Sequence, residues 1–286
     1  MVEQKTLLAV LAHPDDESFG VGGTLALYAA RGVKVYLVCA TRGEAGTVDP
    51  EHMAGFGSIA ELRESELRCA ASHLGLTEVF FLDYRDSGMP GSPDNLHPNA
   101  HVNRPVEEVA ARVVKYIRQL KPDVVITFDP IGGYRHPDHI QIHNATVLAF
   151  EKAADPSFSP GVGEPFQPAA LYFQVIPRGL FKAGVRLLRF FRQDPSHWGR
   201  NKDIDLVDLA AVDFPVHARI DYRVVADRKD EASICHTSQG GGQMRRGFLG
   251  MFFRLYSGIE TYMRAYPPPA PGRRPVTDLF DLPGRS

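Results

Sequence analysis

Short apolar runs alternate with amphipathic segments through the first half of the chain, and this alternation restricts the fold more than any other feature. The apolar runs are rich in Val, Ile, Phe and Tyr and have the length of strands buried on both faces. They occupy residues 6–12, 33–40, 78–83 and 123–128. Between them, apolar residues recur at helical spacing over 22–31, 58–76 and 106–121. Repeated strand–helix–strand units predict right-handed crossovers and an α/β fold with helices on both faces of a mostly parallel sheet.

The alternation of apolar runs and amphipathic segments weakens after a fifth apolar run at 169–176, and we divide the chain there. We expect residues 1–176 to form a Rossmann-like core that carries the chemistry, followed by an inserted segment at 177–210. Residues 211–266 read as a small C-terminal elaboration of the same domain, with a strand near 212–217. Residues 267–286 read as an extended tail, because proline fixes φ and removes the backbone donor. The remaining expected elements are a strand at 169–176 and a helix at 221–236.

Polar clusters follow the ends of the four predicted core strands. The sequence HPDDE comes after the first strand, TRGE after the second, DYRDSGM after the third and DPIGGYRHPDH after the fourth. In open parallel sheets, ligands bind outside the carboxyl ends of the strands. The four polar loops are therefore expected to converge on one rim.

Two of these clusters contain residues that can hold a metal ion. Alone, each could consist of solvated loop residues, helix caps or hydrogen-bonded core groups. Together they supply two imidazoles and one carboxylate, a donor set that Zn²⁺ or Fe²⁺ accepts with positions left open for water and substrate. We predict a catalytic metal site of His13, Asp16 and His139, with Asp15 as the base that takes a proton from water.

Two further residues of the last cluster have candidate roles. His136 is predicted to donate a proton to a departing amine or to stabilise a tetrahedral oxyanion. Asp138 either orients an imidazole or caps the helix that begins after Pro137.

Composition excludes several classes of protein. A net charge of −2 in 286 residues gives no electrostatic footprint for nucleic acid. The initial apolar run is too short for a secretory signal, and no stretch approaches the roughly 18 apolar residues of a membrane span. The three cysteines are far apart and lack a C-x-x-C spacing, so neither a disulfide framework nor a thiolate zinc site is indicated. A cytoplasmic location is expected.

The paired motifs AHPDDE at 12–17 and HPDH at 136–139 resemble those of the PIG-L (LmbE-like) family of zinc-dependent N-acetylglucosaminyl deacetylases. The resemblance covers roughly residues 5–176 and continues in a K-x-x-A-x-x-x-H-x-S-Q pattern. That pattern comprises Lys229, Ala232, His236, Ser238 and Gln239. The resemblance implies the same metal ligands and base as above, with His136 as the acid or oxyanion stabiliser.

The same resemblance implies roles for three residues outside the metal motifs. Arg68 and Asp86 match positions that contact sugar hydroxyls, although Arg68 could equally be an ordinary surface arginine of its helix. Tyr134 matches a tyrosine that reaches the reacting carbonyl from a loop, or it is simply an aromatic residue at the rim.

The segment 177–210 departs from the family pattern and contains a basic amphipathic helix. Its apolar residues are Leu180, Phe181, Val185, Leu188 and Phe191, and its basic residues are Lys182, Arg186, Arg189 and Arg192. The helix could be a lid, a patch for an anionic lipid or ligand, a contact in a homo-oligomer, or a helix packed on its own domain. We predict that it influences which substrate is accepted rather than the chemical step.

The resemblance implies a metal-dependent hydrolase that removes the N-acetyl group from an N-acetylglucosamine-type small molecule, with Zn²⁺ as the cofactor and Fe²⁺ as the alternative. Two rivals remain open at this stage. One is hydrolysis of a non-sugar amide or an ester, and the other is a metal-bearing binding module without turnover. The presence of Asp15 beside the ligands argues against the second rival.

Overall fold

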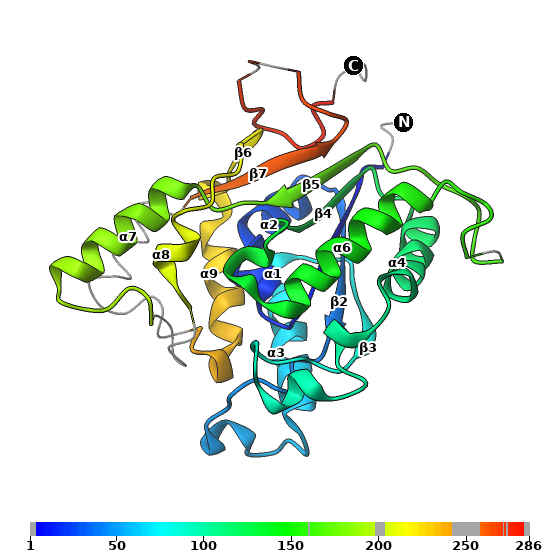
Figure 1. Ribbon diagram of the computed structural model, residues 1–286. Coiled ribbons are helices and arrows are strands. Elements are labelled where there is room, and N and C mark those ends of the chain that lie inside the picture. The colour runs from blue at the N-terminus through cyan, green and yellow to red at the C-terminus, as the bar shows by residue number, and fades with distance from the viewer. Residues whose placement is uncertain are drawn as a thin grey trace.

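A computed structural model describes residues 4–159, 161–197, 204–241, 258–270, 272 and 274–282. These residues form a seven-stranded sheet in the order β3-β2-β1-β4-β5-β7-β6, with helices on both faces (Figure 1). The strands are β1 (Thr6–Leu11), β2 (Lys34–Thr41), β3 (Glu78–Tyr84), β4 (Val124–Phe128), β5 (Ala170–Gln174), β6 (Ala218–Asp221) and β7 (Ile259–Tyr266). The first five strands are parallel, and β7 is antiparallel to both β5 and β6. The predicted mostly parallel α/β fold is confirmed.

On one face of the sheet α3 packs on α9 and on the other α4 packs on α6, while α7 and α8 lie together beyond the edge of these layers (Figure 1). Their bounds are α1 (Asp16–Phe19), α2 (Gly22–Ala30), α3 (Ile59–Leu74), α4 (Val106–Leu120), α5 (Gly132–Arg135), α6 (Pro137–Lys152), α7 (Arg178–Phe190), α8 (Leu206–Leu209) and α9 (Ala226–Cys235). Short 3-10 turns occupy Pro50–Met53, Pro93–Leu96, His101–Asn103, Arg223–Val225 and Thr237–Gln239. The predicted helices of the core all form. Gly75 ends α3 in a left-handed conformation with φ 76°, which glycine adopts without a steric penalty.

The order of the strands places a crevice beside β1. The chain runs from β1 outward to β2 and β3, and then returns to form β4 on the other side of β1. The connection that follows β1 therefore runs over one face of the sheet, and the connection that follows β4 runs over the other. A crevice opens between them at the carboxyl ends of these two strands. All residues of both strands are buried, so this part of the sheet is a rigid base for the loops that follow it.

Two strands at the far edge differ from the sequence prediction. The strand expected at 212–217 is wrong, because these residues form no regular structure and β6 begins at Ala218. Pro215 lies within the predicted stretch and cannot donate a ladder hydrogen bond. The strand β7 was not predicted, because polar side chains interrupt its apolar pattern. Two of these, Glu260 and Arg264, are nevertheless buried.

The cysteine prediction is also wrong, because Cys69 on α3 and Cys235 at the end of α9 form a disulfide. The two cysteines are 166 residues apart, and they meet only because α3 and α9 pack side by side. Cys39 is free and buried in β2. Of the described residues, no helix is long and apolar enough to cross a membrane.

The described residues of the C-terminal tail pack against the core. Val276 pairs with Ala218 beside β6, and the side chain of Leu279 is fully buried. The hydroxyl of Tyr28 accepts a hydrogen bond from the backbone of Leu279 and donates one to Asp278. Composition alone does not indicate this packing.

Candidate metal centre and active-site cavity

The turn after β1 holds Asp15 in a conformation that residues with a side chain rarely adopt. Its φ is 127°, and such strain persists only where the surroundings enforce it. The backbone N–H of Asp15 donates to Glu17 Oε2 at 2.9 Å. Glu17 is fully buried, and its other oxygen lies 2.7 Å from His236 Nε2. His236 and Glu17 together therefore fix the backbone that carries Asp15.

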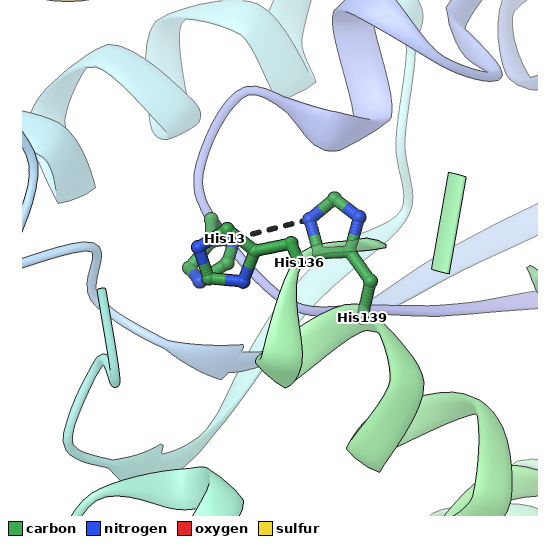
Figure 2. A group of neighbouring side chains, drawn as sticks. All are labelled: His13, His136 and His139. Atoms are coloured by element: carbon green, nitrogen blue, oxygen red, sulfur yellow. Dashed lines mark hydrogen bonds between the residues drawn. The ribbon is translucent and has the colours of Figure 1, made fainter. Parts of the chain in front are cut away.

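Three donor groups, two imidazoles and the carboxylate of Asp16, converge in the crevice between β1 and β4. His139 Nε2 lies 3.3 Å from His13 Nδ1 and 3.3 Å from Asp16 Oδ1, and His13 Nδ1 lies 3.6 Å from Asp16 Oδ2. A tetrahedral ion with ligand distances of about 2.0–2.2 Å would separate its donor atoms by about 3.3–3.6 Å. Figure 2 shows the rings of His13 and His139 turned toward one another in this arrangement. The residues present therefore fit a divalent metal ion.

The other nitrogen of His13 faces two carboxylates. His13 Nε2 lies 3.1 Å from Asp138 Oδ2 and 3.4 Å from Asp86 Oδ1. Asp138 is fully buried and accepts a further hydrogen bond from the backbone of Ser87. This places the proton on Nε2 and leaves Nδ1 as a ligand, a common way to orient a metal-binding histidine. Of the two roles predicted for Asp138, the geometry fits the orienting one.

The charge balance of the site also favours a cation. Burial by itself lowers the pKa of His13, but the carboxylates of Asp86, Asp138 and Asp16 outweigh it and raise that pKa well above its usual value. The pKa of Asp16 is lowered despite its burial, because His139 and His13 lie beside it. Excess negative charge therefore surrounds the point where the three donor atoms meet.

A second set of three donors includes His136 in place of Asp16. The rings of His13, His136 and His139 lie together, with centroids 4.5–5.3 Å apart (Figure 2). However, His136 Nδ1 accepts the backbone N–H of Asp138 and so caps the start of α6. Burial and the neighbouring imidazoles lower the pKa of His136 well below its usual value. A neutral ring capped at Nδ1 carries its proton on Nε2, which makes His136 a hydrogen-bond donor rather than a ligand.

Asp15 immediately precedes Asp16 and also lines the cavity at this site. Its Oδ2 accepts a hydrogen bond of 2.8 Å from Arg63. Burial raises the pKa of Asp15 to about 6, although the charge of Arg63 opposes this change. Arg63 also donates to the carbonyls of Pro14 and Gly43, so it ties the turn after β1 to the loop after β2.

Of the residues that the sequence assigned to sugar binding, only Asp86 lies in the cavity at this site. Arg68 is not among its lining residues; the side chain is 61% exposed and pairs with Glu64 one turn earlier on α3. Arg63 lines the cavity instead, and sequence reasoning missed it. The helical spacing distinguishes the two arginines, because Arg63 lies on the same helix face as the apolar residues Leu67 and Ala70, whereas Arg68 does not.

Tyr134 lies between His139 and a cluster of apolar residues from α7 and α8. Its ring centroid is 5.0 Å from that of His139, and burial raises the pKa of its hydroxyl well above the usual value. The preceding Gly133 has φ 66°, which lets the chain turn sharply before Tyr134.

These residues form the floor of a cavity of about 1100 Å³. Its lining includes the polar residues Asp49, His52, Ser92 and Asp94. It also includes the apolar residues Ile176, Phe181, Ile204, Leu206 and Leu209, which we call the apolar wall. The volume exceeds what an acetyl group and one sugar ring require, so the cavity has room for a larger substrate.

The K-x-x-A-x-x-x-H-x-S-Q residues attach the C-terminal part of the chain to this floor. Lys229 pairs with Glu260, which also accepts the backbone N–H groups at the start of α2. Ser238 donates to Glu66 on α3, and Gln239 lines the cavity. Lys229, His236 and Ser238 of this pattern therefore have structural roles, since each binds a buried glutamate of another element.

Comparisons with known proteins agree with this geometry. The family model PIG-L, described as GlcNAc-PI de-N-acetylase, matches residues 8–150. The chain is 40% identical over 244 residues to a 1D-myo-inositol 2-acetamido-2-deoxy-alpha-D-glucopyranoside deacetylase of Streptomyces scabiei, covering 82% of this chain and 76% of that protein. A protein of the same name from Thermobifida fusca is 36% identical and covers 98% of this chain and all of its own length.

A solved structure has the same fold. It is the N,N'-diacetylchitobiose deacetylase of Pyrococcus horikoshii in complex with an inhibitor, with a TM-score of 0.63 and 22% identity. The match covers 92% of this chain and 84% of that one. From the family model and the relatives in sequence, we conclude that the chain belongs to the PIG-L family and is a deacetylase.

Proposed function

We propose that this deacetylase removes the N-acetyl group from an N-acetylglucosamine conjugate by attack of a metal-activated water. The observation that supports this most is the convergence of three donor atoms beside a carboxylate that is not itself a ligand. The names of the relatives support an N-acetylglucosamine substrate, with a glucosaminyl inositol as the first compound to test.

His13 Nδ1, Asp16 and His139 Nε2 would hold the ion, with Zn²⁺ as the expected metal and Fe²⁺ as the alternative. When bound there, such an ion polarises the amide carbonyl and lowers the pKa of water. Asp138 and Asp86 keep the ring of His13 in the orientation that this requires.

Asp15 acts as the base. With a pKa of about 6 it is ionised at neutral pH, yet it is basic enough to accept the proton that water loses as its oxygen bonds to the carbonyl carbon. Arg63 holds the carboxylate in place through a hydrogen bond to its Oδ2. When the carbon–nitrogen bond breaks, Asp15 returns that proton to the nitrogen of the leaving amine.

His136 and Tyr134 stabilise the negative charge that develops on the carbonyl oxygen. Both are neutral, since burial lowers the pKa of His136 and raises that of Tyr134. A neutral imidazole and a phenol each offer one hydrogen to an oxyanion. Asp86 accepts hydrogen bonds from sugar hydroxyls at the edge of the same floor.

The test is an acetate-release assay on the metal-reconstituted protein. Its substrates are N-acetylglucosamine, glucosaminyl inositol in its N-acetyl form, and N-acetylcyclohexylamine as an amide of similar size without hydroxyls. The two sugars should be hydrolysed and the cyclohexyl amide should not. Turnover of the cyclohexyl amide at the same kcat/KM would exclude a sugar-specific function.

A further inference from the structure

The segment between β5 and β6 forms an apolar unit against the cavity. Buried side chains of α7 and α8 pack together, namely Val185, Leu188, Leu206 and Leu209. Phe181 and Ile204 lie at the edge of this cluster and are only partly buried, and both line the cavity. Ile176, which is 37% exposed, extends the same wall at the end of β5.

The basic face of α7 points away from the cavity. Lys182, Arg186 and Arg189 are exposed, and none of them is among the lining residues. The predicted influence of this helix on substrate choice therefore cannot come from its arginines. The face that meets the cavity is apolar, and this changes the class of ligand that it would recognise.

The apolar wall is continuous with the reaction centre. Tyr134 packs against the cluster of α7 and α8, while its ring lies 5.0 Å from that of His139. A group bound along this wall would therefore lie beside the reacting amide. Hydroxyl groups would gain nothing there, because apolar side chains offer them no hydrogen-bond partner. Burial of an alkyl or aryl group against the same surface is favourable.

We propose that Ile176, Phe181, Ile204, Leu206 and Leu209 form a subsite for an alkyl or aryl aglycone of the N-acetylglucosamine conjugate. This inference rests on the proposed function, which fixes the acyl group as acetyl. It further predicts that an apolar aglycone is preferred over the inositol named for the relatives. The sugar and the acetamide occupy the polar floor, and the aglycone extends from Tyr134 toward Ile176.

The experiment compares methyl and hexyl glycosides of N-acetylglucosamine with the same anomeric configuration. Each buried methylene contributes enough that the hexyl compound should have a kcat/KM at least about tenfold higher than the methyl compound. Phe181→Ala should lower this hexyl-to-methyl ratio several-fold. Phe190→Ala is the matched control, because Phe190 lies half a turn around the same helix and is 80% exposed. Its ratio should equal that of the unmodified protein.

Ile176→Ala provides a second variant for the case in which Phe181→Ala fails to fold, and it too should lower the ratio. Equal kcat/KM values for the two glycosides would overturn the subsite and leave the proposed function intact. A preference for N-hexanoylglucosamine over N-acetylglucosamine would also overturn it, since the wall would then serve the acyl group. Failure to deacetylate any N-acetylglucosamine glycoside would instead refute the proposed function.

Discussion

Asp15 differs from an ordinary surface aspartate in conformation, burial and pKa. Its φ of 127° is enforced by Glu17 and His236, and its carboxylate faces Arg63. Because burial raises its pKa to about 6, its protonation state changes close to neutral pH. These properties determine how the rate should respond to pH.

We expect kcat/KM to decrease as the pH falls, with the midpoint of this decrease at or below about pH 6. The sign follows from the role of the group, since a base must be deprotonated and Asp15 gains its proton as the pH falls through its pKa. A bound cation beside the carboxylate would move this midpoint to lower pH.

Asp15→Asn should keep the metal but lose turnover by at least about 100-fold. Metal content and the pH–rate profile should be measured on the same sample, and near-normal activity of this variant would assign the base elsewhere.

Substitutions of Asp16 and His136 distinguish the two sets of candidate ligands. We expect Asp16→Ala to lose the metal, as His13→Ala and His139→Ala should. His136→Ala should retain the metal and lose turnover, because its Nδ1 already accepts the backbone N–H of Asp138 and its other nitrogen acts as a donor. Metal analysis after dialysis is the measurement. The reverse pattern would show that three imidazoles hold the ion.

For single residues, the sequence indicates which residue types belong to the site better than it indicates which residues contact one another in space. The histidines and aspartates of the two motifs could be identified because they follow strands that must end on one rim. Arg63 and Arg68 occur in the same stretch, ELRESELR, and only their helix face separates a cavity residue from an exposed one. The apolar residues around Arg63 carry that information.

Among the elements, α9 and the turn that follows it support the candidate site without supplying a candidate ligand or base. His236 is bonded to Glu17, and Glu17 accepts the backbone N–H of Asp15. Through this chain of contacts His236 supports Asp15 without being one of the candidate ligands. We regard His236 as a positioning residue. Its loss should affect the alignment of the base more than the binding of substrate.

We therefore expect His236→Ala to lower kcat by about 10- to 100-fold with KM and metal content nearly unchanged. His236→Gln, which keeps a side-chain donor, should recover part of kcat. Ser233→Ala on the same helix is a control, since its hydroxyl donates only to the carbonyl of Lys229 within α9. A parallel loss of kcat, metal and thermal stability in His236→Ala would point to a general folding role instead.

The predictability of elements follows burial. The strands β1, β2 and β4 could be predicted because burial on both faces makes them almost continuously apolar. The edge strand β3 is only partly buried, but it keeps a run of four apolar residues. By contrast, β7 contains Glu260 and Arg264, which are buried only because other parts of the fold supply partners such as Lys229. Such partners come from distant parts of the sequence, so a local pattern does not reveal them.

For the whole molecule, the disulfide between Cys69 and Cys235 links the two helices of one face. Sequence spacing gave no indication of it, because 166 residues separate the cysteines and only the packing of α3 on α9 brings them together. The size of the cavity and the apolar character of its wall also depend on such long-range packing.

Replacing both cysteines with serine should lower the free energy of unfolding by about 2–4 kcal/mol, because the cross-link restricts the unfolded chain. Urea denaturation with and without a thiol reductant measures this change. The unmodified protein under reducing conditions should match the double variant, whose own stability should not respond to the reductant. An unmodified protein that is equally stable in both conditions would contradict a stabilising cross-link.

The contact between Glu17 and His236 also has a consequence for the order in which the site becomes complete during synthesis. All three candidate ligands and the proposed base lie within the first 139 residues, but the partner of Glu17 follows it by 219 residues. At translation rates of about 5–20 residues per second, the emerging chain would wait roughly 10–40 s for that partner. A chain that ends before His236 would contain every proposed reacting group while the turn that carries Asp15 still lacked its support. A late part of the chain would therefore complete a site that the first half provides.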